Sequence, residues 1–203
     1  MEILERIVVE IREAFRYCKT RNKNKFCGDR FEEWVVENSN ISKDGLTNSG
    51  NGKSFWRLLD WRGDKYINGY RALSSSAPDL LMECISTDRS YGVGEIIAVE
   101  CKWKSNFPDK LLEIKEILKY EAYLRDDKAR YSVKHLFYVF GFGWSCNPVE
   151  VYVVPANALY TYNVNTGSVI FHVKGKGEEL LKQLERYKWN KAKSRFLMYW
   201  GNK

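Results

Sequence analysis

The chain has 203 residues, of which 44% are hydrophobic and 15% aromatic, a composition that suits one compact domain over residues 1–203 with a sizeable core. Its formal net charge of +7 is compatible with a polyanionic partner such as nucleic acid but does not require one. The five cysteines are scattered and form no CxxC pair, and the sequence shows neither a signal-peptide pattern nor an apolar run of about 20 residues. These features argue against a secreted or membrane protein. We therefore expect a cytoplasmic protein without a membrane partner.

The N-terminal part is predicted to be helical. Apolar residues recur at helical spacing over residues 3–17, and a second helix is predicted over 28–38, "GDRFEEWVVEN", with Asp29 as a candidate cap. A polar loop follows over residues 39–54. Its "GNGKS" resembles the end of a phosphate-binding loop, but the first glycine and the preceding strand of that motif are missing, which favours a turn.

The rest of the chain mixes strands and helices. After a segment rich in Trp, Tyr and Arg over residues 55–76, a hairpin is predicted from strands 79–86 and 95–103. The later predicted elements are a helix over 109–125 that starts at Asp109, strands over 135–142, 149–156 and 168–173, a helix over 178–188 and an apolar tail over 194–200. This order predicts a mixed α/β fold and not an alternating doubly wound sheet.

The predicted strand over 95–103 ends in two opposite charges. Side chains alternate across a sheet, so the strand separates into two sets, with Ile97, Val99, Cys101 and Trp103 on one face and Ile96, Ala98, Glu100 and Lys102 on the other. Burying either charge is unfavourable unless it is paired or bound to an ion. The pattern therefore indicates either a salt-bridged strand end or a functional site.

These charges belong to a longer pattern that resembles a known signature. Pro78-Asp79, followed on the next strand by Glu100-Cys101-Lys102, resembles the signature of the PD-(D/E)xK nucleases, also called restriction-endonuclease-like. In that superfamily an upstream helix often carries a glutamate after a Gly-x-x-aromatic entry, which "GDRFEEW" matches. The resemblance spans about residues 26–155, with the terminal helices as elaborations. It implies a restriction-endonuclease-like core, in which a central mixed β-sheet with an antiparallel meander is flanked by helices.

The resemblance implies a magnesium-dependent DNA endonuclease, such as a restriction enzyme, with Mn²⁺ as an alternative ion. A divalent cation held by carboxylates stabilises charge on the phosphate and ionises a water near neutral pH. Asp79 and Glu100, brought together by hairpin pairing, would supply the carboxylate oxygens, and the family adds the backbone carbonyl of Cys101 as a third ligand. Lys102 would stabilise the attacking water or help to deprotonate it. Its structural alternative is a simple ion pair with Glu100.

Three other glutamates compete to complete the site. An advance of about 100° per residue places Glu32 at the edge of the buried arc of its helix and Glu33 nearly opposite. We therefore assign Glu32 a supporting catalytic role, either in orienting water or at a second metal site. Glu83 shares strand parity with Asp79 and remains an alternative ligand.

The aromatic and basic segment just before Asp79 is predicted to contact DNA. The candidate phosphate contacts are Arg57, Arg62, Lys65 and Arg71, although the aromatic residues between them also suit simple packing. Alternatives to a DNA endonuclease are a junction-resolving, repair or RNA-cleaving nuclease of the same fold and a catalytically silent nucleic-acid-binding domain. The presence of Asp79, Glu100 and Lys102 argues against a catalytically silent domain. A homodimer is left open.

Overall fold

The computed structural model describes residues 23–39, 41–42, 56–61, 77–85, 91–107, 110–125 and 131–189. Three predicted features, the helix over 3–17, the "GNGKS" turn and the apolar tail over 194–200, lie outside these residues. No helix within the described ranges has the length and apolar character needed to cross a membrane.

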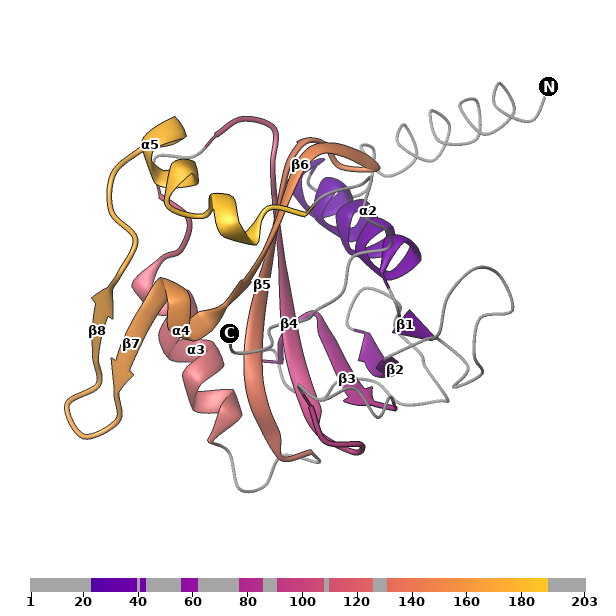
Figure 1. Cartoon of the computed structure of the whole chain (residues 1–203), viewed down its shortest axis with the longest axis vertical. Coiled ribbons are helices and arrows are strands. Elements are labelled where there is room, and N and C mark those ends of the chain that lie inside the picture. Colours follow the sequence, from indigo (N-terminus) through magenta and orange to yellow (C-terminus); the bar gives the residue numbers. More distant parts are fainter. Residues whose placement is uncertain are drawn as a thin grey trace.

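The described residues form a mixed α/β structure, as predicted (Figure 1). In chain order its elements are α2 (Lys23–Asn38), β1 (Ile41–Ser42), β2 (Trp56–Trp61), β3 (Leu80–Cys84), β4 (Ile96–Lys104), α3 (Ile114–Leu124), β5 (Val133–Trp144), β6 (Asn147–Pro155), α4 (Ala156–Leu159), β7 (Tyr160–Asn163), β8 (Ser168–Phe171) and α5 (Gly177–Lys182), followed by a 3₁₀ turn, Glu185–Tyr187.

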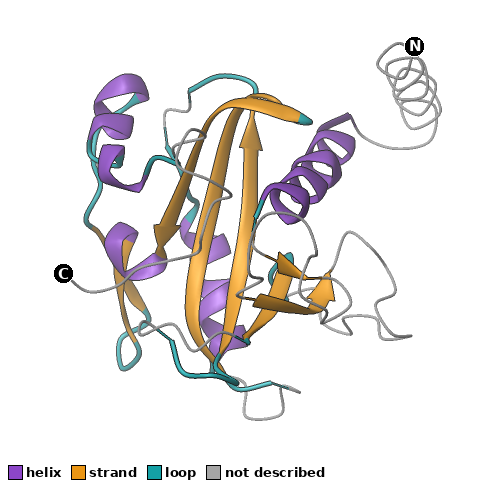
Figure 2. Ribbon diagram, turned by 45° about the vertical axis from the view of Figure 1, so that its right-hand side comes forward, coloured by secondary structure: helices purple, strands orange, loops and turns teal. Residues whose placement is uncertain are grey.

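Six strands form a curled mixed sheet in the order β1-β2-β3-β4-β5-β6 (Figures 1 and 2). Strands β2, β3 and β4 pair antiparallel as a meander, which confirms the predicted hairpin. Strand β5 pairs parallel with β4 after the crossover through α3, and β6 returns antiparallel to β5. A separate antiparallel pair, β7 and β8, stands beside the main sheet.

The sheet is buried on both faces. One face packs against α2, through residues such as Phe31, Val35, Leu80, Met82, Val99 and Val139. The other packs against α3, α4 and α5, through residues such as Leu81, Ala98, Ile117, Tyr138, Leu159 and Leu181. The alternation predicted for β4 is therefore confirmed, because Ile97 and Val99 face α2 whereas Ala98 faces α3.

Two predicted helix starts are wrong. Helix α2 begins at Lys23 and not near residue 28, so Asp29 lies inside the helix and does not cap it. A single interior glycine costs only about 1 kcal/mol, so Gly28 does not end the helix. Helix α3 begins at Ile114 and not at Asp109, because Glu113 caps it and forms a reciprocal capping box with Glu116.

Strands were missed where the sequence lacks a clear period. The short strand β1 lies within the predicted loop over 39–54, where Ile41 pairs parallel with Trp56 of β2. Strand β2 itself carries a bulge between Leu58 and Asp60, which interrupts the alternation that would reveal it. The predicted C-terminal helix over 178–188 is divided, since Leu184 donates its N–H to the carbonyl of Leu181 at 2.9 Å and continues as the 3₁₀ turn.

Helix α2 lies against the sheet where β5 has no side chain. A Cβ atom added to Gly141 would lie 2.2 Å from the ring of Phe31, which is fully buried. The two atoms cannot approach so closely, so any larger residue at this position would push α2 off the sheet. Gly141 thus fixes the depth at which α2, and every side chain on its inner face, meets the strands.

We predict that Gly141→Ala lowers the free energy of unfolding by about 1–3 kcal/mol, because it overpacks the contact with Phe31. Urea unfolding followed by circular dichroism measures this change. Gly28→Ala is the matched control, since an added Cβ there has open space within a helix and should stabilise the protein by about 0.5–1 kcal/mol. Equal effects of the two substitutions would contradict the close contact.

Candidate active site

The candidate site lies where the meander opens. Strand β3 begins at Leu80, which pairs with Val99, whereas β4 continues to Lys104 with β5 alongside (Figure 1). The edge of β4 beyond Val99 is therefore not covered by β3. Asp79 stands immediately before β3, at the point where the pairing of β3 with β4 ends.

Asp79 reaches across this opening to β4. Its buried carboxylate accepts a hydrogen bond at 2.8 Å from the backbone N–H of Cys101. The N–H and C=O of one strand residue point to the same side, so the carbonyl of Cys101 faces the same opening. Burial raises the pKa of Asp79 well above its ordinary value, and the nearby carboxylates of Glu100 and Glu32 raise it further. Three acidic groups therefore converge here.

Glu100 is the most deeply buried of these acids, with 4% of its surface exposed. Its Oε1 atom lies 2.9 Å from Nζ of Lys102 and also accepts a hydrogen bond from the Tyr120 hydroxyl. Its Oε2 atom is buried and has no hydrogen-bond partner among the described residues. Among the described residues, one oxygen of this buried carboxylate is thus satisfied and the other is not, which is uncommon for a buried polar atom.

Lys102 is held between two carboxylates. Its Nζ lies 2.9 Å from Glu100 and 2.8 Å from Glu116 on α3. Burial by itself would lower the pKa of Lys102, but Glu100 and the hydrogen bond to Glu116 outweigh burial and raise it. Lys102 is therefore a fixed ammonium group in this arrangement, and the predicted ion pair with Glu100 is present.

Helix α2 brings Glu32 to the same place from the other side. Glu32 is 8% exposed, and its Oε2 accepts a hydrogen bond from Nε1 of Trp61 at 3.2 Å. The Glu33 side chain is 41% exposed and pairs with Arg30 at 2.7 Å. The structure thus buries Glu32 and leaves Glu33 at the surface, as the helical angle predicts.

Two other predicted residues lie away from the opening. Glu83 pairs with Ile96 at the opposite end of β3 from Asp79, so the shared strand parity does not bring it to the site. Arg57 lies beside Glu83 and forms an ion pair with it, with a 3.0 Å hydrogen bond from its Nε. Arg57 is therefore neither near Asp79 nor an uncompensated cation. The other candidate contacts, Arg62, Lys65 and Arg71, lie outside the described residues.

Sequence reasoning missed the two contributions of α3. Tyr120 and Glu116 are four residues apart, so they share a face of the helix and both turn towards β4. The sequence did not single out either residue, because the amphipathic pattern of this helix predicts Tyr120 as a core residue and Glu116 as a surface residue. The capping box fixes the rotamer of Glu116, because its Oε2 accepts the Glu113 N–H at 3.1 Å while its Oε1 meets Lys102.

The donors at the opening fit a hard divalent cation. No group of three His, Cys, Asp or Glu side chains close enough to hold an ion occurs among the described residues. Magnesium does not need one, because it is usually held by one or two carboxylates and completes its shell with water and phosphate. Asp79, the carbonyl of Cys101 and the Glu100 Oε2, which has no partner in the described part of the chain, could together supply such a donor set.

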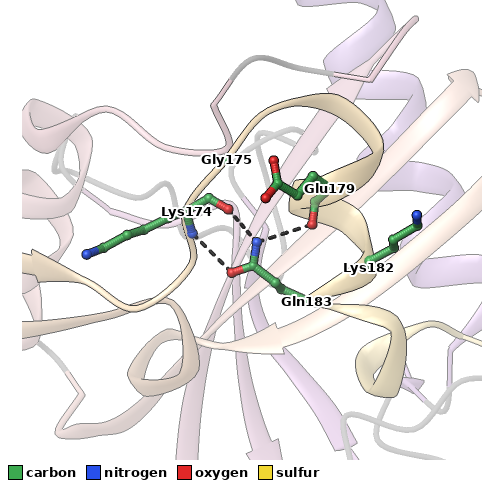
Figure 3. Close-up of a pocket in the computed structure, with 5 residues that line it drawn as sticks. All are labelled: Lys174, Gly175, Glu179, Lys182 and Gln183. Atoms are coloured by element: carbon green, nitrogen blue, oxygen red, sulfur yellow. Dashed lines mark hydrogen bonds between the residues drawn. The ribbon is translucent and has the colours of Figure 1, made fainter.

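A surface hollow elsewhere on the molecule shows no comparable convergence. Figure 3 shows one that is lined by Lys174, Gly175, Glu179, Lys182 and Gln183. The Gln183 amide is occupied there by backbone groups, accepting from the Lys174 N–H at 3.2 Å and donating to the Glu179 carbonyl at 3.2 Å. The ammonium groups of Lys174 and Lys182 point away from each other, so they do not form a shared anion site (Figure 3).

Comparison with known proteins does not add to this picture: no family model matches the chain, and neither a curated protein nor a solved structure matches it.

We predict that Asp79→Asn stabilises the metal-free protein near neutral pH. The folded-state pKa of Asp79 is raised above the unfolded value, so ionising it destabilises the fold. That loss begins as the pH rises past the unfolded-state pKa and is complete above the folded-state pKa. Asn cannot ionise, yet it keeps an oxygen for the Cys101 N–H. In EDTA the variant should melt a few degrees above the parent at about pH 8, and the two should converge near about pH 4.

Magnesium provides the control for this prediction. A bound cation stabilises the folded parent by mass action, so Mg²⁺ should raise the melting temperature of the parent and have little effect on Asp79→Asn. Glu83→Gln, an acid at the other end of β3, should respond to Mg²⁺ like the parent. Identical melting of parent and Asp79→Asn at every pH would contradict the burial of Asp79 near the other two carboxylates.

Proposed function

We propose that the protein is a magnesium-dependent nuclease that hydrolyses phosphodiester bonds in DNA. The observation that carries this proposal is the buried Oε2 of Glu100 near Asp79, which has no hydrogen-bond partner among the described residues, together with the fixed ammonium group of Lys102 two residues further along β4. A buried carboxylate oxygen without a partner is costly in free energy, and functional sites are where such costs persist. The net charge of +7 favours association with a polyanion.

Asp79, Glu100 and the Cys101 carbonyl would hold the cation. When bound, Mg²⁺ supplies charge stabilisation to the phosphate and lowers the pKa of a coordinated water. Mn²⁺ fits the same oxygen donors. A dication held there would also offset the repulsion that the Asp79 carboxylate meets from Glu100.

Lys102 has an electrostatic role in this proposal. Its ammonium group is held by Glu100 and Glu116, so it is poised to stabilise negative charge on the phosphate and to orient the attacking water. A lysine whose pKa is raised is a poor general base, so Lys102 would not take the proton of the attacking water. That proton would be lost to solvent or accepted by Glu32. Glu32 reaches the opening from α2 and is anchored by Trp61.

The order of elements supports a restriction-endonuclease-like core. Helix α2 precedes the β2-β3-β4 meander, and α3 then leads to β5, with Asp79 and Glu100 on adjacent strands. This is the arrangement that the sequence resemblance implies. A restriction enzyme is one member of that class, and the same site suits a junction-resolving, repair or RNA-cleaving enzyme.

The test is incubation of purified protein with plasmid, single-stranded DNA and RNA, with and without Mg²⁺. We predict metal-dependent cleavage of DNA, its loss in Asp79→Ala and Glu100→Gln, and a fall of roughly 100- to 1000-fold in Lys102→Ala, with magnesium and DNA binding retained in the last. Removing Lys102 takes away an interaction made with the transition state, so the rate should fall more than the affinity.

Glu83→Gln is the matched control, because this glutamate is ion-paired on the same strand as the site but at its other end. It should cleave at the parental rate. Glu100→Gln that cleaves like the parent would rule out the metal assignment. If Lys102→Ala unfolds, the lysine is a structural ion-pair partner of Glu100.

A further inference from the structure

The β5–β6 hairpin extends the sheet beyond the candidate site. Lys102 pairs with Phe140 and Lys104 with Phe142, and β5 then continues to Trp144, which pairs with Asn147 at the tip. At a rise of about 3.3 Å per residue, Trp144 lies roughly 13 Å along the strand from the level of Lys102. The tip therefore projects from the same end of the sheet that carries the opening beside β4.

Trp144 is a large aromatic residue that lies mostly in solvent and not in the core. Its side chain is 75% exposed, although large aromatic residues are usually buried. Val149, which follows it across the turn, is 78% exposed. A hairpin tip that served only to join two strands would not need an indole at this position.

The backbone below Trp144 is held in place. A bulge occurs between Phe142 and Gly143, and Gly143 has φ +95, a conformation that other residues rarely adopt. The carbonyl of Gly143 accepts a hydrogen bond at 2.9 Å from Nε1 of Trp103 on β4. The tip is thus anchored to the strand that carries Glu100 and Lys102.

The charge around the tip suits a polyanion. Residues 143–149, "GWSCNPV", contain no acid, and Lys104 at the end of β4 is exposed, with the carboxylate of Glu116 near enough to interact with its charge. The nearest acid along β6, Glu150, is paired with Lys188 at 2.5 Å. An exposed aromatic ring on a segment without acids, at the same end of the sheet as an exposed lysine, is a combination that suits a nucleic-acid base and its phosphate.

Resting on the proposed function, we infer that Trp144 stacks on an unpaired base and directs the site to nucleic acid that contains a single-stranded segment, such as a gap, flap or junction. An indole on a narrow turn has no partner in an intact duplex, whose bases are already stacked, whereas an unpaired base offers its free face. A separation of roughly 13 Å along the strand places the stacked base a few nucleotides from the scissile phosphate and not next to it.

Binding measured in EDTA tests this inference without relying on cleavage. Fluorescence anisotropy should show that Trp144→Ala binds gapped DNA roughly 5- to 150-fold more weakly than the parent, the effect of losing one stacked base, while affinity for intact duplex changes little. Trp144→Phe should restore part of the affinity. A fluorescent 2-aminopurine placed in the gap should be quenched by the parent and not by Trp144→Ala.

Ile170→Ala is the matched control, because this residue is 62% exposed on β8 of the separate two-stranded sheet and should not alter binding. Equal loss of affinity for gapped and intact DNA in Trp144→Ala, or no loss for either, overturns the inference. So does conversion of a dimer to a monomer in sedimentation, which would make the tip a contact between copies. Cleavage that fails for every substrate while the gap preference persists would instead count against the proposed nuclease alone.

Discussion

The burial of the Glu100 carboxylate is the constraint on which this end of the sheet depends. A carboxylate removed from water must be compensated, and within the described ranges Lys102 and the Tyr120 hydroxyl compensate one of its two oxygens. Helix α3 has to pack so that Tyr120 and Glu116 reach β4, and β3 has to end before Glu100 so that Asp79 can accept the Cys101 N–H. The positions of α3 and β3 therefore both depend on the Glu100 side chain.

One face of β4 carries the charged residues of the candidate site, and the other packs against α2. Glu100 and Lys102 point to the α3 side and form the charged cluster, whereas Cys101 and Trp103 pack on the α2 side. Trp103 also anchors the β5–β6 tip through Gly143. Across the sheet, the contact of Phe31 with Gly141 sets the height of α2 and so the reach of Glu32. The strands therefore hold acidic side chains close together although they repel one another. Clusters of this kind lower the stability of a fold and are common at functional sites.

Features that depend on local pattern could be predicted from the sequence, and features that depend on packing could not. Strand alternation and a single hairpin are enough to place Asp79 near Glu100, and helix angle is enough to separate Glu32 from Glu33. Parity alone made Glu83 a candidate, but position along the strand excludes it from the opening. Tyr120 and Glu116 were missed because the rotation of α3 over the sheet is a tertiary property. Strand β2 was missed because its bulge breaks the period.

The most direct test of the account is diffraction from crystals of the protein grown with Mn²⁺, with data collected at the manganese absorption edge. The account predicts an anomalous peak at the opening beside β4, bonded to Asp79, to the Oε2 of Glu100 and to the carbonyl of Cys101, at the roughly 2.0–2.6 Å typical of oxygen ligands to hard divalent cations. A Glu100 Oε2 that is satisfied by a protein group, with manganese absent from the opening or bound elsewhere, would contradict it.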